Sequence, residues 1–217
     1  MITAHIATIP ERLRTLRKVV EAVVPQVNKV YVELNGHQTV PKWLRDLRFA
    51  NCEMLDNSLG DAAKWLHCNY EPSFCVFIDD DLIVPRGFVS YLMGGLRKYG
   101  GAVGLHGRNY PVPVNNFRQW SENYRCLGTV TEDKRVHLLG TGCMLFDNTQ
   151  TILDQSVFEH RNMADVLFAR FCHKNNIPMM VLKHKSNYLK YIPQEHTIWR
   201  SARDTTIHTE ILKSFLK

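Results

Sequence analysis

Short apolar runs alternate with amphipathic segments along most of the chain, and this pattern predicts strands that alternate with helices. The predicted strands are residues 2–8, 29–34, 52–55, 73–78, 101–105, 136–146 and 179–182. One predicted helix begins at Pro10, and others span residues 42–47, 60–66, 87–99 and 163–173. A last short helix is predicted in the polar tail. This alternation favours a single α/β domain in which helices flank a mainly parallel central sheet.

Three segments carry most of the information in this pattern. Residues 73–78 (SFCVFI) are nearly all apolar, which is typical of a strand covered on both faces. The first helix has Leu13, Leu16 and Val20 at helical spacing, so the basic residues around them lie on its solvent face. From residue 108 to 134 the pattern dissolves into a loop rich in Asn, Pro, Arg and aromatic residues. Loops of that length are usually functional or mobile.

Composition agrees with one folded domain. The chain has 217 residues, of which 45% are hydrophobic, and that is enough for a real core. No two of the six cysteines have the CxxC spacing of a zinc or redox site, so we expect reduced, structural thiols. The apolar runs are too short to span a bilayer, and the N-terminus does not resemble a signal peptide. We therefore expect a cytoplasmic location.

The charge balance narrows the choice of partner. Lysine and arginine number 27 against 21 acidic residues, and the formal net charge is +6. The basic residues are spread along the chain, whereas a nucleic-acid-binding module usually concentrates them on one element with aromatic residues between them. We expect no nucleic-acid partner. A mild positive charge also suits anionic substrates such as sugar nucleotides.

Three consecutive carboxylates, Asp79, Asp80 and Asp81, follow the predicted strand 73–78. Ligands of open α/β sheets bind beyond the carboxyl ends of the strands. Three carboxylates at such a position repel one another unless protons or a cation intervene. Mg²⁺ or Mn²⁺ would bind these oxygens, bridge a pyrophosphate and neutralise a departing nucleotide diphosphate. The plainer alternative is that Asp81 caps the helix near Pro85 and the other two face water.

Five segments come in an order that carries a resemblance. They are IATIPERLRTL (6–16), LGDAAKW (59–65), FIDDDLIVP (77–85), LLGTGCMLFD (138–147) and NMADVLFARF (162–171). Together they resemble the nucleotide-sugar-dependent glycosyltransferases of the GT-A fold, in particular the family-2-like group. The last three are also similar to the catalytic module of exostosin-type hexosaminyltransferases. The resemblance covers residues 2–182, and the small chain also resembles the capsid-glycosylating enzymes of chlorella-infecting viruses.

This resemblance implies a single GT-A-type domain over residues 1–217. Its nucleotide-sugar-binding half would span about residues 1–107, and its acceptor half and tail about residues 108–217. The implied reaction moves a sugar from a nucleotide diphosphate donor, with uridine as the base, to a hydroxyl of a glycan or glycoprotein. It depends on Mn²⁺ or Mg²⁺ bound through a DXD motif. For a viral enzyme the location would be the host cytoplasm.

The resemblance also assigns the donor-binding residues. Thr8, Pro10 and Arg12 match the first strand-to-helix turn, which in these enzymes holds the uracil and ribose. Asp61 and Lys64 match a segment that lies against the nucleotide. The plain alternative for Arg12 is a charge on the solvated face of its helix, and for Lys64 it is an ordinary surface lysine at a helix start.

The same resemblance gives each member of the acidic triplet a role. Asp79 would face the ribose and contribute to the metal site, while Asp81 would be the main metal ligand. Asp80 would hydrogen-bond the sugar or support its neighbours. Gly142, in the Gly-Thr-Gly turn at 140–142, matches the part that lies under the donor sugar, although such a turn is also a simple kink in a strand.

Asp165 is the candidate for the reacting centre. In GT-A enzymes the acid at this place deprotonates the acceptor hydroxyl or stabilises the sugar-like cation of the transition state. Its plain alternative is an acid in the first turn of a helix, where the helix dipole favours it. The exostosin pattern has two adjacent acids here, whereas this chain has Ala164 and Asp165, so both catalytic roles stay open.

The tail and the long loop supply further candidates. In many GT-A enzymes a histidine after the last core strand joins the metal site, and His184, His196 and His208 are candidates for that role. Arg200 and Arg203 could fold over a diphosphate. Tyr110, Phe117, Trp120 and Tyr124 could form a platform for an acceptor sugar or could anchor the long loop to the core.

Two other functions share some of these features. A nucleotidyltransferase, which makes a sugar nucleotide, also combines an α/β layout with metal-binding carboxylates. It usually grips a triphosphate with a glycine-rich loop after the first strand, and residues 7–14 (ATIPERLR) contain no glycine. A basic nucleic-acid-binding module would not place a carboxylate triplet beside its ligand, because the triplet would repel phosphate.

Overall fold

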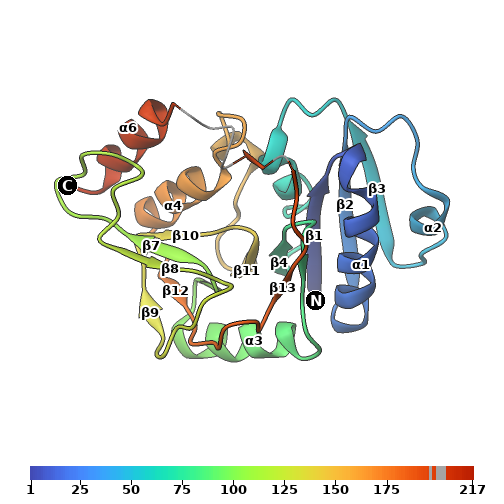
Figure 1. Ribbon diagram of the computed structural model, residues 1–217, viewed down its shortest axis with the longest axis horizontal. Helices are drawn as coiled ribbons and strands as arrows, with labels where there is room; N and C mark the ends of the chain where they lie inside the picture. Colours follow the sequence, from blue (N-terminus) through green and yellow to red (C-terminus); the bar gives the residue numbers. More distant parts are fainter. Residues whose placement is uncertain (196, 199–203) are drawn as a thin grey trace.

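The computed structural model describes residues 1–195, 197–198 and 204–217. Eight strands form its central sheet (Figure 1). In spatial order they are β3 (Ala50–Leu55), β2 (Lys29–Asn35), β1 (Ile2–Thr8), β4 (Phe74–Ile78), β11 (Cys143–Asp147), β6 (Ala102–Gly104), β12 (Met179–Val181) and β9 (Lys134–Arg135).

The direction of the strands divides this sheet. Strands β3, β2, β1 and β4 pair in parallel, and β12 pairs in parallel with β6. Strand β11 runs antiparallel to both β4 and β6, and β9 runs antiparallel to β12. The predicted α/β class with a mainly parallel central sheet flanked by helices is therefore confirmed. The antiparallel β11 separates the first four strands from the rest.

Helices cover both faces of the sheet. They are α1 (Leu13–Val23), α2 (Lys42–Arg45), α3 (Phe88–Tyr99), α4 (Ala164–Lys174) and α6 (Thr206–Phe215). Short 3-10 helices are found at Pro10–Arg12, Val24–Gln26, Gly60–Trp65 and Gln155–Val157. The predicted helix 60–66 therefore forms as a 3-10 helix, and the helix that begins at Pro10 starts with one turn of the same kind.

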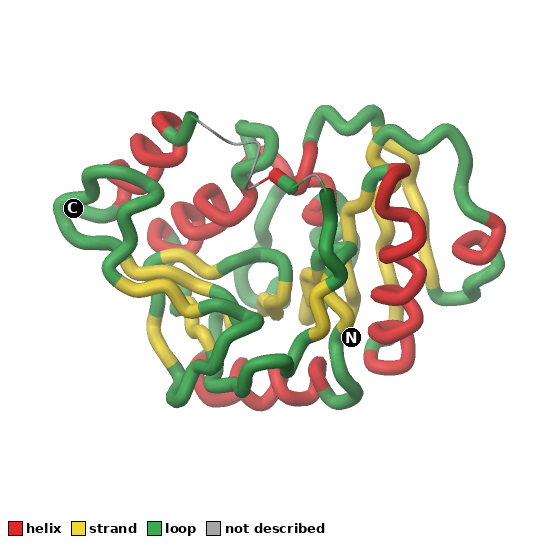
Figure 2. Tube along the Cα trace, in the orientation of Figure 1, coloured by secondary structure: helices red, strands yellow, loops and turns green. Residues whose placement is uncertain are grey.

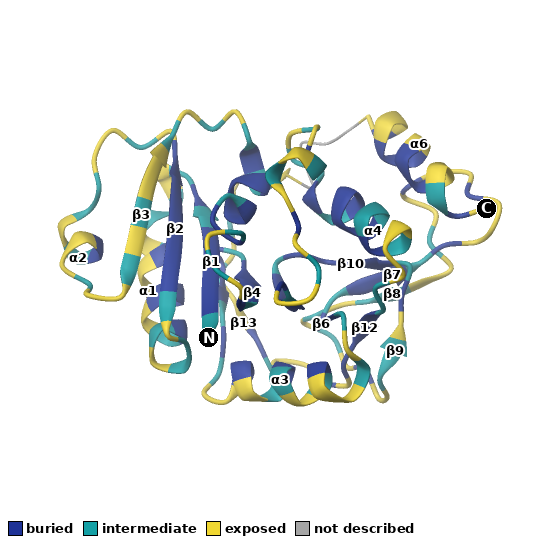
Figure 3. Cartoon of the chain, turned by 180° about the vertical axis from the view of Figure 1, so that it is seen from behind, coloured by how far each residue is buried: buried dark blue, intermediate teal, exposed yellow. Residues whose placement is uncertain are grey.

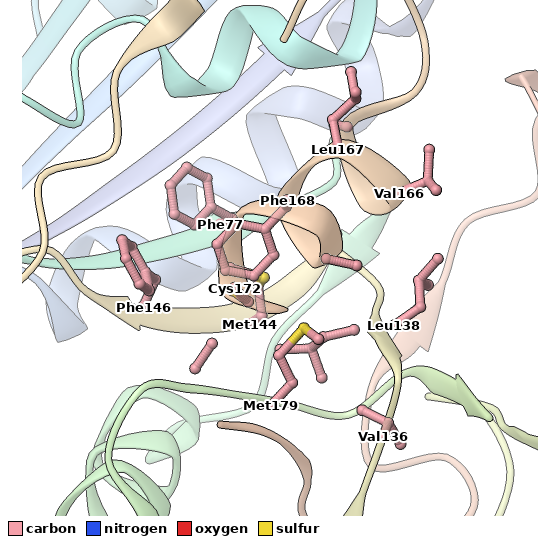
Figure 4. Packing of buried hydrophobic residues seen from close by; sticks show 14 of the residues in the cluster. Phe77, Val136, Leu138, Met144, Phe146, Val166, Leu167, Phe168, Cys172 and Met179 are labelled. Carbon is pink, nitrogen blue, oxygen red and sulfur yellow. The ribbon is translucent and has the colours of Figure 1, made fainter. Parts of the chain in front are cut away.

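Alternate residues of the central strands pack into two hydrophobic cores, one on each face of the sheet. Val76 and Ile78 of β4 pack with α1 and α3, whereas Cys75 and Phe77 point to the opposite core with α4 and α6. Figure 4 shows Phe77 close to Phe146 of β11 and Phe168 of α4 in that second core. Strands β1, β2 and β4 are buried along most of their lengths, while the edge strand β3 is largely exposed (Figure 3).

The prediction of a loop from residue 108 to 134 is only partly correct. Its ends and middle contribute β7 (Gly107–Asn109), β8 (Glu122–Tyr124) and the first residue of β9. Strands β7 and β8 join β10 (Leu138–Leu139) in a separate three-stranded antiparallel sheet. Figure 2 shows this part as long loops interrupted by short strands. Strands of two or three residues are too short to show a period of two in the sequence.

Residues 183–195, which follow β12, cross the molecule as a strap. Its strand β13 (Lys190–Tyr191) pairs with β5 (Leu82–Ile83), directly after the acidic triplet (Figure 1). The backbone N–H of Ile192 also donates to the carbonyl oxygen of Asp81 at 2.9 Å. The strap therefore fixes the backbone behind the triplet.

Two observations bear on the compositional expectations. All six cysteines are free, as expected of structural thiols, and four of them are buried. Within the described part of the chain, no helix is both long enough and apolar enough to cross a membrane.

Candidate functional site

A cavity of about 660 Å³ opens where β1 and β4 end. The residues after these two strands form one wall, and the start of α4, the loop at 117–118 and α6 form the other. Most of the donor-site and catalytic residues predicted from the sequence line this cavity. These are Thr8, Arg12, Asp61, Lys64, Asp79, Asp80, Asp81 and Asp165. Thr8, Arg12 and the triplet come together because the parallel strands β1 and β4 present their carboxyl ends at the same edge of the sheet. Asp165 is brought to the cavity by the first turn of α4.

Asp80 is held by two side chains from the first strand-to-helix turn. The Thr8 hydroxyl donates to its Oδ2 at 2.7 Å, and Arg12 Nη1 donates to its Oδ1 at 2.7 Å. Burial raises the pKa of Asp80, and Arg12 and Thr8 act against that rise. Since both oxygens of Asp80 are already engaged, this carboxylate is suited to supporting its neighbours rather than contacting a ligand.

Asp79 is the most open member of the triplet, with 48% of its side chain exposed. Its Oδ1 lies 2.9 Å from the Nζ of Lys64, whose side chain is only 4% exposed. Burial alone would lower the pKa of Lys64, but Asp79, Asp61 and Asp165 together raise it. The site therefore contains a buried, charged lysine beside the carboxylate that faces the cavity.

Gly142 shapes the triplet without lining the cavity. Its carbonyl oxygen accepts the backbone N–H of Asp79 at 2.8 Å. A Cβ atom at position 142 would lie 2.0 Å from Oδ2 of Asp79, so any side chain there would displace that carboxylate. Pro10 is also absent from the described lining of the cavity. Its role is in the backbone, because its fixed φ suits the start of the 3-10 turn Pro10–Arg12, which carries Arg12 to the triplet.

Asp81 carries negative charge that its surroundings compensate poorly. Its Oδ2 lies 3.4 Å from Arg12 Nη1, a longer contact than the one that Asp80 makes. Burial, followed by the neighbouring charges of Asp79 and Asp80, raises the pKa of Asp81 to about 7. A cation at this position would stabilise the ionised form.

The donor set fits one kind of metal site and not another. Within the described residues, no group of three or more His, Cys, Asp or Glu side chains is arranged to hold a metal ion. An all-protein cage of the calcium or zinc type is therefore not built there. Mg²⁺ and Mn²⁺ are commonly held by one or two carboxylates, with water and substrate phosphates as the other ligands. Asp81 and Asp79 can supply such a pair.

Asp61 joins the two walls of the cavity. Its backbone N–H donates to Oδ1 of Asn162 at 3.2 Å, and its Oδ2 accepts the backbone N–H of Ala164 at 3.4 Å. Gly60 adopts φ +60°, and a Cβ atom there would lie 2.1 Å from the Asn162 side chain. Burial raises the pKa of Asp61 to about 7, although Lys64 pulls it down. This contact sets the start of α4 against the 3-10 helix Gly60–Trp65.

Asp165 lies in the first turn of α4 and is oriented by Thr141. Both the backbone N–H and the hydroxyl of Thr141 donate to Asp165 Oδ1, at 2.8 and 2.7 Å. Thr141 is 1% exposed, so its own position is fixed by packing. One oxygen of Asp165 is thus held in place, while Asp165 itself lines the cavity.

The aromatic residues of the long loop divide between the two roles expected of them. Phe117 lines the cavity, but Tyr110, Trp120 and Tyr124 are absent from its described lining and pack on the core. The guanidinium of Arg108 lies 5.0 Å from the Trp120 ring centre and 5.7 Å from that of Phe117. Most of these aromatic side chains therefore anchor the loop, and Phe117 alone of the four contributes to the wall.

The histidine and arginine candidates of the tail differ in whether they line the cavity. His184 does not line the cavity, since its Nδ1 and Nε2 lie 2.7 and 3.1 Å from the carbonyl oxygens of Leu182 and Arg125. His208 lines the cavity on the side of Asp165. His196, Arg200 and Arg203 lie outside the described residues.

The sequence did not identify several residues that build the site. Thr141, which holds Asp165, is the middle residue of the Gly-Thr-Gly turn, and that turn was the available signal for it. Asn162 precedes α4 and adopts a left-handed backbone with φ +59°, a conformation that asparagine tolerates but that the sequence does not reveal. Arg108, Arg118 and Arg161 line the cavity, but nothing in their sequence context separates them from surface charges.

Comparisons with known proteins find only partial likenesses. No family model matches the chain, and no curated protein matches it. It is similar to glucosyl-3-phosphoglycerate synthase from Mycobacterium tuberculosis, solved with Mn²⁺, UDP-glucose and phosphoglyceric acid, at 20% identity and a TM-score of 0.38. That match covers 48% of this chain and 42% of the synthase. The chain is also similar to the apo form of the glycosyltransferase GlyE from Streptococcus pneumoniae, at 11% identity and a TM-score of 0.34.

The second match covers 69% of this chain and 34% of GlyE. The chain therefore spans less than half of the length of either structure. Likenesses of this extent assign no role to any residue of this chain.

Proposed function

We propose that this chain is a glycosyltransferase of the GT-A type. It would move a sugar from a nucleotide diphosphate donor, with uridine as the base, to a hydroxyl group of a glycan or glycoprotein. The observation that carries the proposal is the cavity whose lining gathers the acidic triplet, Arg12, Lys64 and Asp165. Its volume lies within the range of small-molecule sites, about 300–1,000 Å³.

The donor end suits a diphosphate and its metal ion. Asp81 and Asp79 would hold Mg²⁺ or Mn²⁺, with phosphate oxygens completing the coordination. The ion would act as a Lewis acid that neutralises the charge developing on the departing nucleotide diphosphate. Thr8 and Arg12 fix Asp80 by hydrogen bonds at 2.7 Å, so the backbone of the triplet keeps its position as ligands exchange.

Lys64 supplies a second positive charge close to the leaving group. It is buried and charged, and its Nζ lies 2.9 Å from Asp79. A phosphate that approaches the metal beside Asp79 would therefore also meet the lysine. Preorganised charges in a site shielded from water stabilise a leaving group more than the same charges in water do.

Asp165 would act on the acceptor. Thr141 holds its Oδ1, which leaves Oδ2 to take the proton from the acceptor hydroxyl as that oxygen attacks the sugar. Because α4 carries Asp165 while β4 leads into the triplet, the reaction would take place between two halves of one domain. We assign about residues 1–107 to the donor and about residues 108–217 to the acceptor.

A thermal-shift screen tests this function directly. Purified protein is melted with UDP, UDP-glucose, UDP-galactose or UDP-N-acetylglucosamine, each with and without Mn²⁺, and with UTP plus Mn²⁺ as the competing case. Because a ligand of the folded state raises the melting temperature by mass action, we expect UDP or a UDP-sugar to stabilise the protein only when the metal is present.

Two results would contradict the proposal. Stabilisation by UTP but not by UDP or any UDP-sugar would indicate a nucleotidyltransferase. Stabilisation by single-stranded RNA or DNA, with no response to nucleotides, would indicate a nucleic-acid-binding module. In the same screen, the variant Glu53→Ala removes a carboxylate that is absent from the described lining of the cavity. It should give the same response to every ligand as the wild-type protein.

A further inference from the structure

The two edges of the central sheet differ in how well they are protected from pairing with another chain. One edge is β9, which has only two residues, Lys134 and Arg135, both basic. The other is β3, which has six residues and a single charged side chain, that of Glu53. Short length and positive charge are common means of keeping an edge strand from pairing, and β3 has neither. The β3 edge is therefore the place where a further strand can be added.

The hydrogen bonds between β2 and β3 fix which backbone groups of β3 face outward. The backbone N–H of Val30 donates to the carbonyl oxygen of Phe49 at 2.9 Å, and that of Gly36 donates to Leu55 at 2.6 Å. Along a strand, backbone groups point alternately toward the paired strand and away from it. The odd-numbered residues of β3 therefore bond to β2, and its even-numbered residues direct their N–H and C=O groups outward.

The even-numbered residues are Ala50, Cys52 and Met54. The N–H of Ala50 is used within the chain, where it donates to the carbonyl oxygen of Leu47 at 3.0 Å. The outward N–H groups of Cys52 and Met54 make no hydrogen bond to any residue that the structure describes. Helix α2 lies outside β3 in Figures 1 and 3, but it buries Leu44 in the core that α1 shares, so it packs on one face of the sheet. The outward groups are thus left for a partner strand.

The edge is complementary to itself when a second copy runs in the opposite direction. A two-fold axis through Cys52 places Ala50 opposite Met54 of the second copy, and outward groups then face outward groups. The two Cys52 residues exchange two hydrogen bonds, and the N–H of each Met54 meets the carbonyl oxygen of the other Ala50. In this register Glu53 lies opposite Asn51, so no two like charges face each other across the strands.

The residues at the ends of the strand match in the same register. Arg48 comes just before β3 and Asp56 just after it, and both are exposed. The axis through Cys52 places Arg48 of each copy opposite Asp56 of the other. It also places Phe49, which is 55% exposed, opposite Leu55. Opposite charges and apolar side chains that lie directly across an antiparallel pair stabilise it.

We propose that two copies of this chain join through β3, in antiparallel register about a two-fold axis at Cys52. The central sheet would then run without interruption from one copy into the other. The charges at the two ends of β3 complement one another when the edge meets its own copy in reverse, which favours a second copy over an unrelated strand. Because the pairing reverses the strand direction, the two cavities open at opposite ends of the joined sheet. Such pairing is independent of the proposed glycosyltransferase function.

The charges at the ends of β3 allow a test that is specific to this register. Along an extended strand, positions 48 and 56 are about 26 Å apart, so Arg48 and Asp56 of one chain cannot reach each other. Arg48→Asp places two acids opposite each other at both ends of the pairing, and Asp56→Arg places two arginines there. The double variant Arg48→Asp/Asp56→Arg restores opposite charges with their positions exchanged. Only contact between two copies can produce such a recovery.

Sedimentation equilibrium over a range of protein concentrations measures the Kd of the dimer. We expect a monomer–dimer equilibrium for the wild-type chain. Each single variant should raise the Kd roughly tenfold, because it loses two ion pairs and gains two like-charge contacts. The double variant should return to within about threefold of the wild type. The matched control is Arg135→Asp, which makes the same change of charge on the opposite edge strand β9 and should leave the Kd unchanged.

A further variant tests the backbone pairing itself. Met54→Pro removes an outward N–H that β2 does not use, and proline is tolerated on an edge strand at such a position. The substitution removes the two hydrogen bonds that the Met54 N–H groups donate across the axis. We expect the Kd to rise by about 30- to 100-fold, with the circular dichroism spectrum unchanged.

Three results would contradict this pairing. The first is a wild-type chain that stays monomeric up to about 1 mM. The second is a dimer that the single charge variants leave unchanged, or that the double variant fails to restore, since the copies then meet at another surface or in another register. The third is a folded Met54→Pro protein that dimerises as tightly as the wild type. If Met54→Pro does not fold, the charge exchange decides the outcome.

Discussion

Two clusters of acidic and basic side chains lie in the first half of the chain, and each has buried members. Only the first, the open cluster, lines the 660 Å³ cavity, and the second is called the closed cluster below. The first contains the triplet at the end of β4, with Arg12 and Lys64. The second joins β2, β3 and the segment after the 3-10 helix. There Nδ1 of His67 lies 2.8 Å from Glu33 and its Nε2 lies 2.9 Å from Glu53.

The clusters share their chemistry and differ in what covers them. Burial raises the pKa of Glu33 to about 7, the same value that Asp81 reaches. Tyr31 stacks on His67 at 5.0 Å and on His5 at 5.1 Å, so aromatic rings cover the inner side of the second cluster, while Glu53 at its outer side is 45% exposed. Asp81, by contrast, lines the 660 Å³ cavity. A shifted pKa therefore does not by itself identify a functional site, and access to a ligand-sized space distinguishes the two clusters.

The largest expected effect is at the open cluster. Asp81→Ala should abolish sugar transfer and the metal-dependent stabilisation by UDP, because a metal contact of this kind contributes several kcal/mol. Isothermal titration of UDP with Mn²⁺ should show affinity at least about 100-fold weaker, with the fold intact by circular dichroism. Glu53→Ala removes a carboxylate from the closed cluster and should bind UDP normally. Unchanged metal-dependent binding in Asp81→Ala would remove Asp81 from the metal site.

A second change tests Asp165, which lines the same cavity. Asp165→Asn should lower kcat by about 100- to 10,000-fold, the usual contribution of a general base, with UDP affinity nearly unchanged. Steady-state kinetics and donor titration on the same preparation give both numbers. Equal losses in the two would make Asp165 a donor-binding residue, and loss of melting temperature alone would leave it only a helix-dipole role.

A smaller effect is expected where a hydrogen bond orients the carboxylate. Thr141→Val keeps the branched shape and the backbone N–H but removes the hydroxyl that donates to Asp165 at 2.7 Å. We expect kcat to fall by about 3- to 30-fold, as for one hydrogen bond, with KM for the donor unchanged. The control is Thr149→Val, since the exposed Thr149 makes the same two contacts to Asp147 outside the cavity. Equal effects of the two substitutions would mean that Thr141 contributes only stability.

The closed cluster should affect stability and leave activity unchanged. The pKa of Glu33 is raised by burial from 4.5 to about 7, and that of His67 is raised above 6.5 because Glu33 and Glu53 outweigh the effect of its burial. Both groups bind protons more tightly in the folded state, so their stabilising contribution is complete below about pH 4.5 and declines as the pH rises through 7. Glu33→Gln should flatten that decline.

Thermal melts from pH 5 to pH 8 measure this difference. We expect the fall in melting temperature to be smaller in Glu33→Gln than in the wild type, by several degrees for a change of about 1–3 kcal/mol. His5, whose pKa burial lowers to about 3, contributes the opposite slope below pH 6.5, and it does so in both proteins. An identical slope in the two, or a loss of transfer in the variant, would contradict the structural role of this cluster.

The predicted elements of the parallel half agree well with the structure, and the reason is local. β4 is apolar at each of its five positions, and α1 has its apolar residues at helical spacing, so each element can be recognised without its partners. The weakest prediction is the loop at 108–134, where β7 and β8 span only three residues each. Strands that short depend on their pairing partners and not on their own residues.

The candidate site shows the same division between local and long-range information. The sequence alone placed three carboxylates at the end of a buried strand, because strand and triplet are contiguous. It could not pair Lys64 with Asp79, Thr141 with Asp165, or His208 with Phe117, since 15, 24 and 91 positions separate the members of these pairs. Only the tertiary structure closes those distances, and it also decides which buried charges face a cavity and which are covered by aromatic rings. A carboxylate has the same composition in both places, and its function depends on what the fold leaves open beside it.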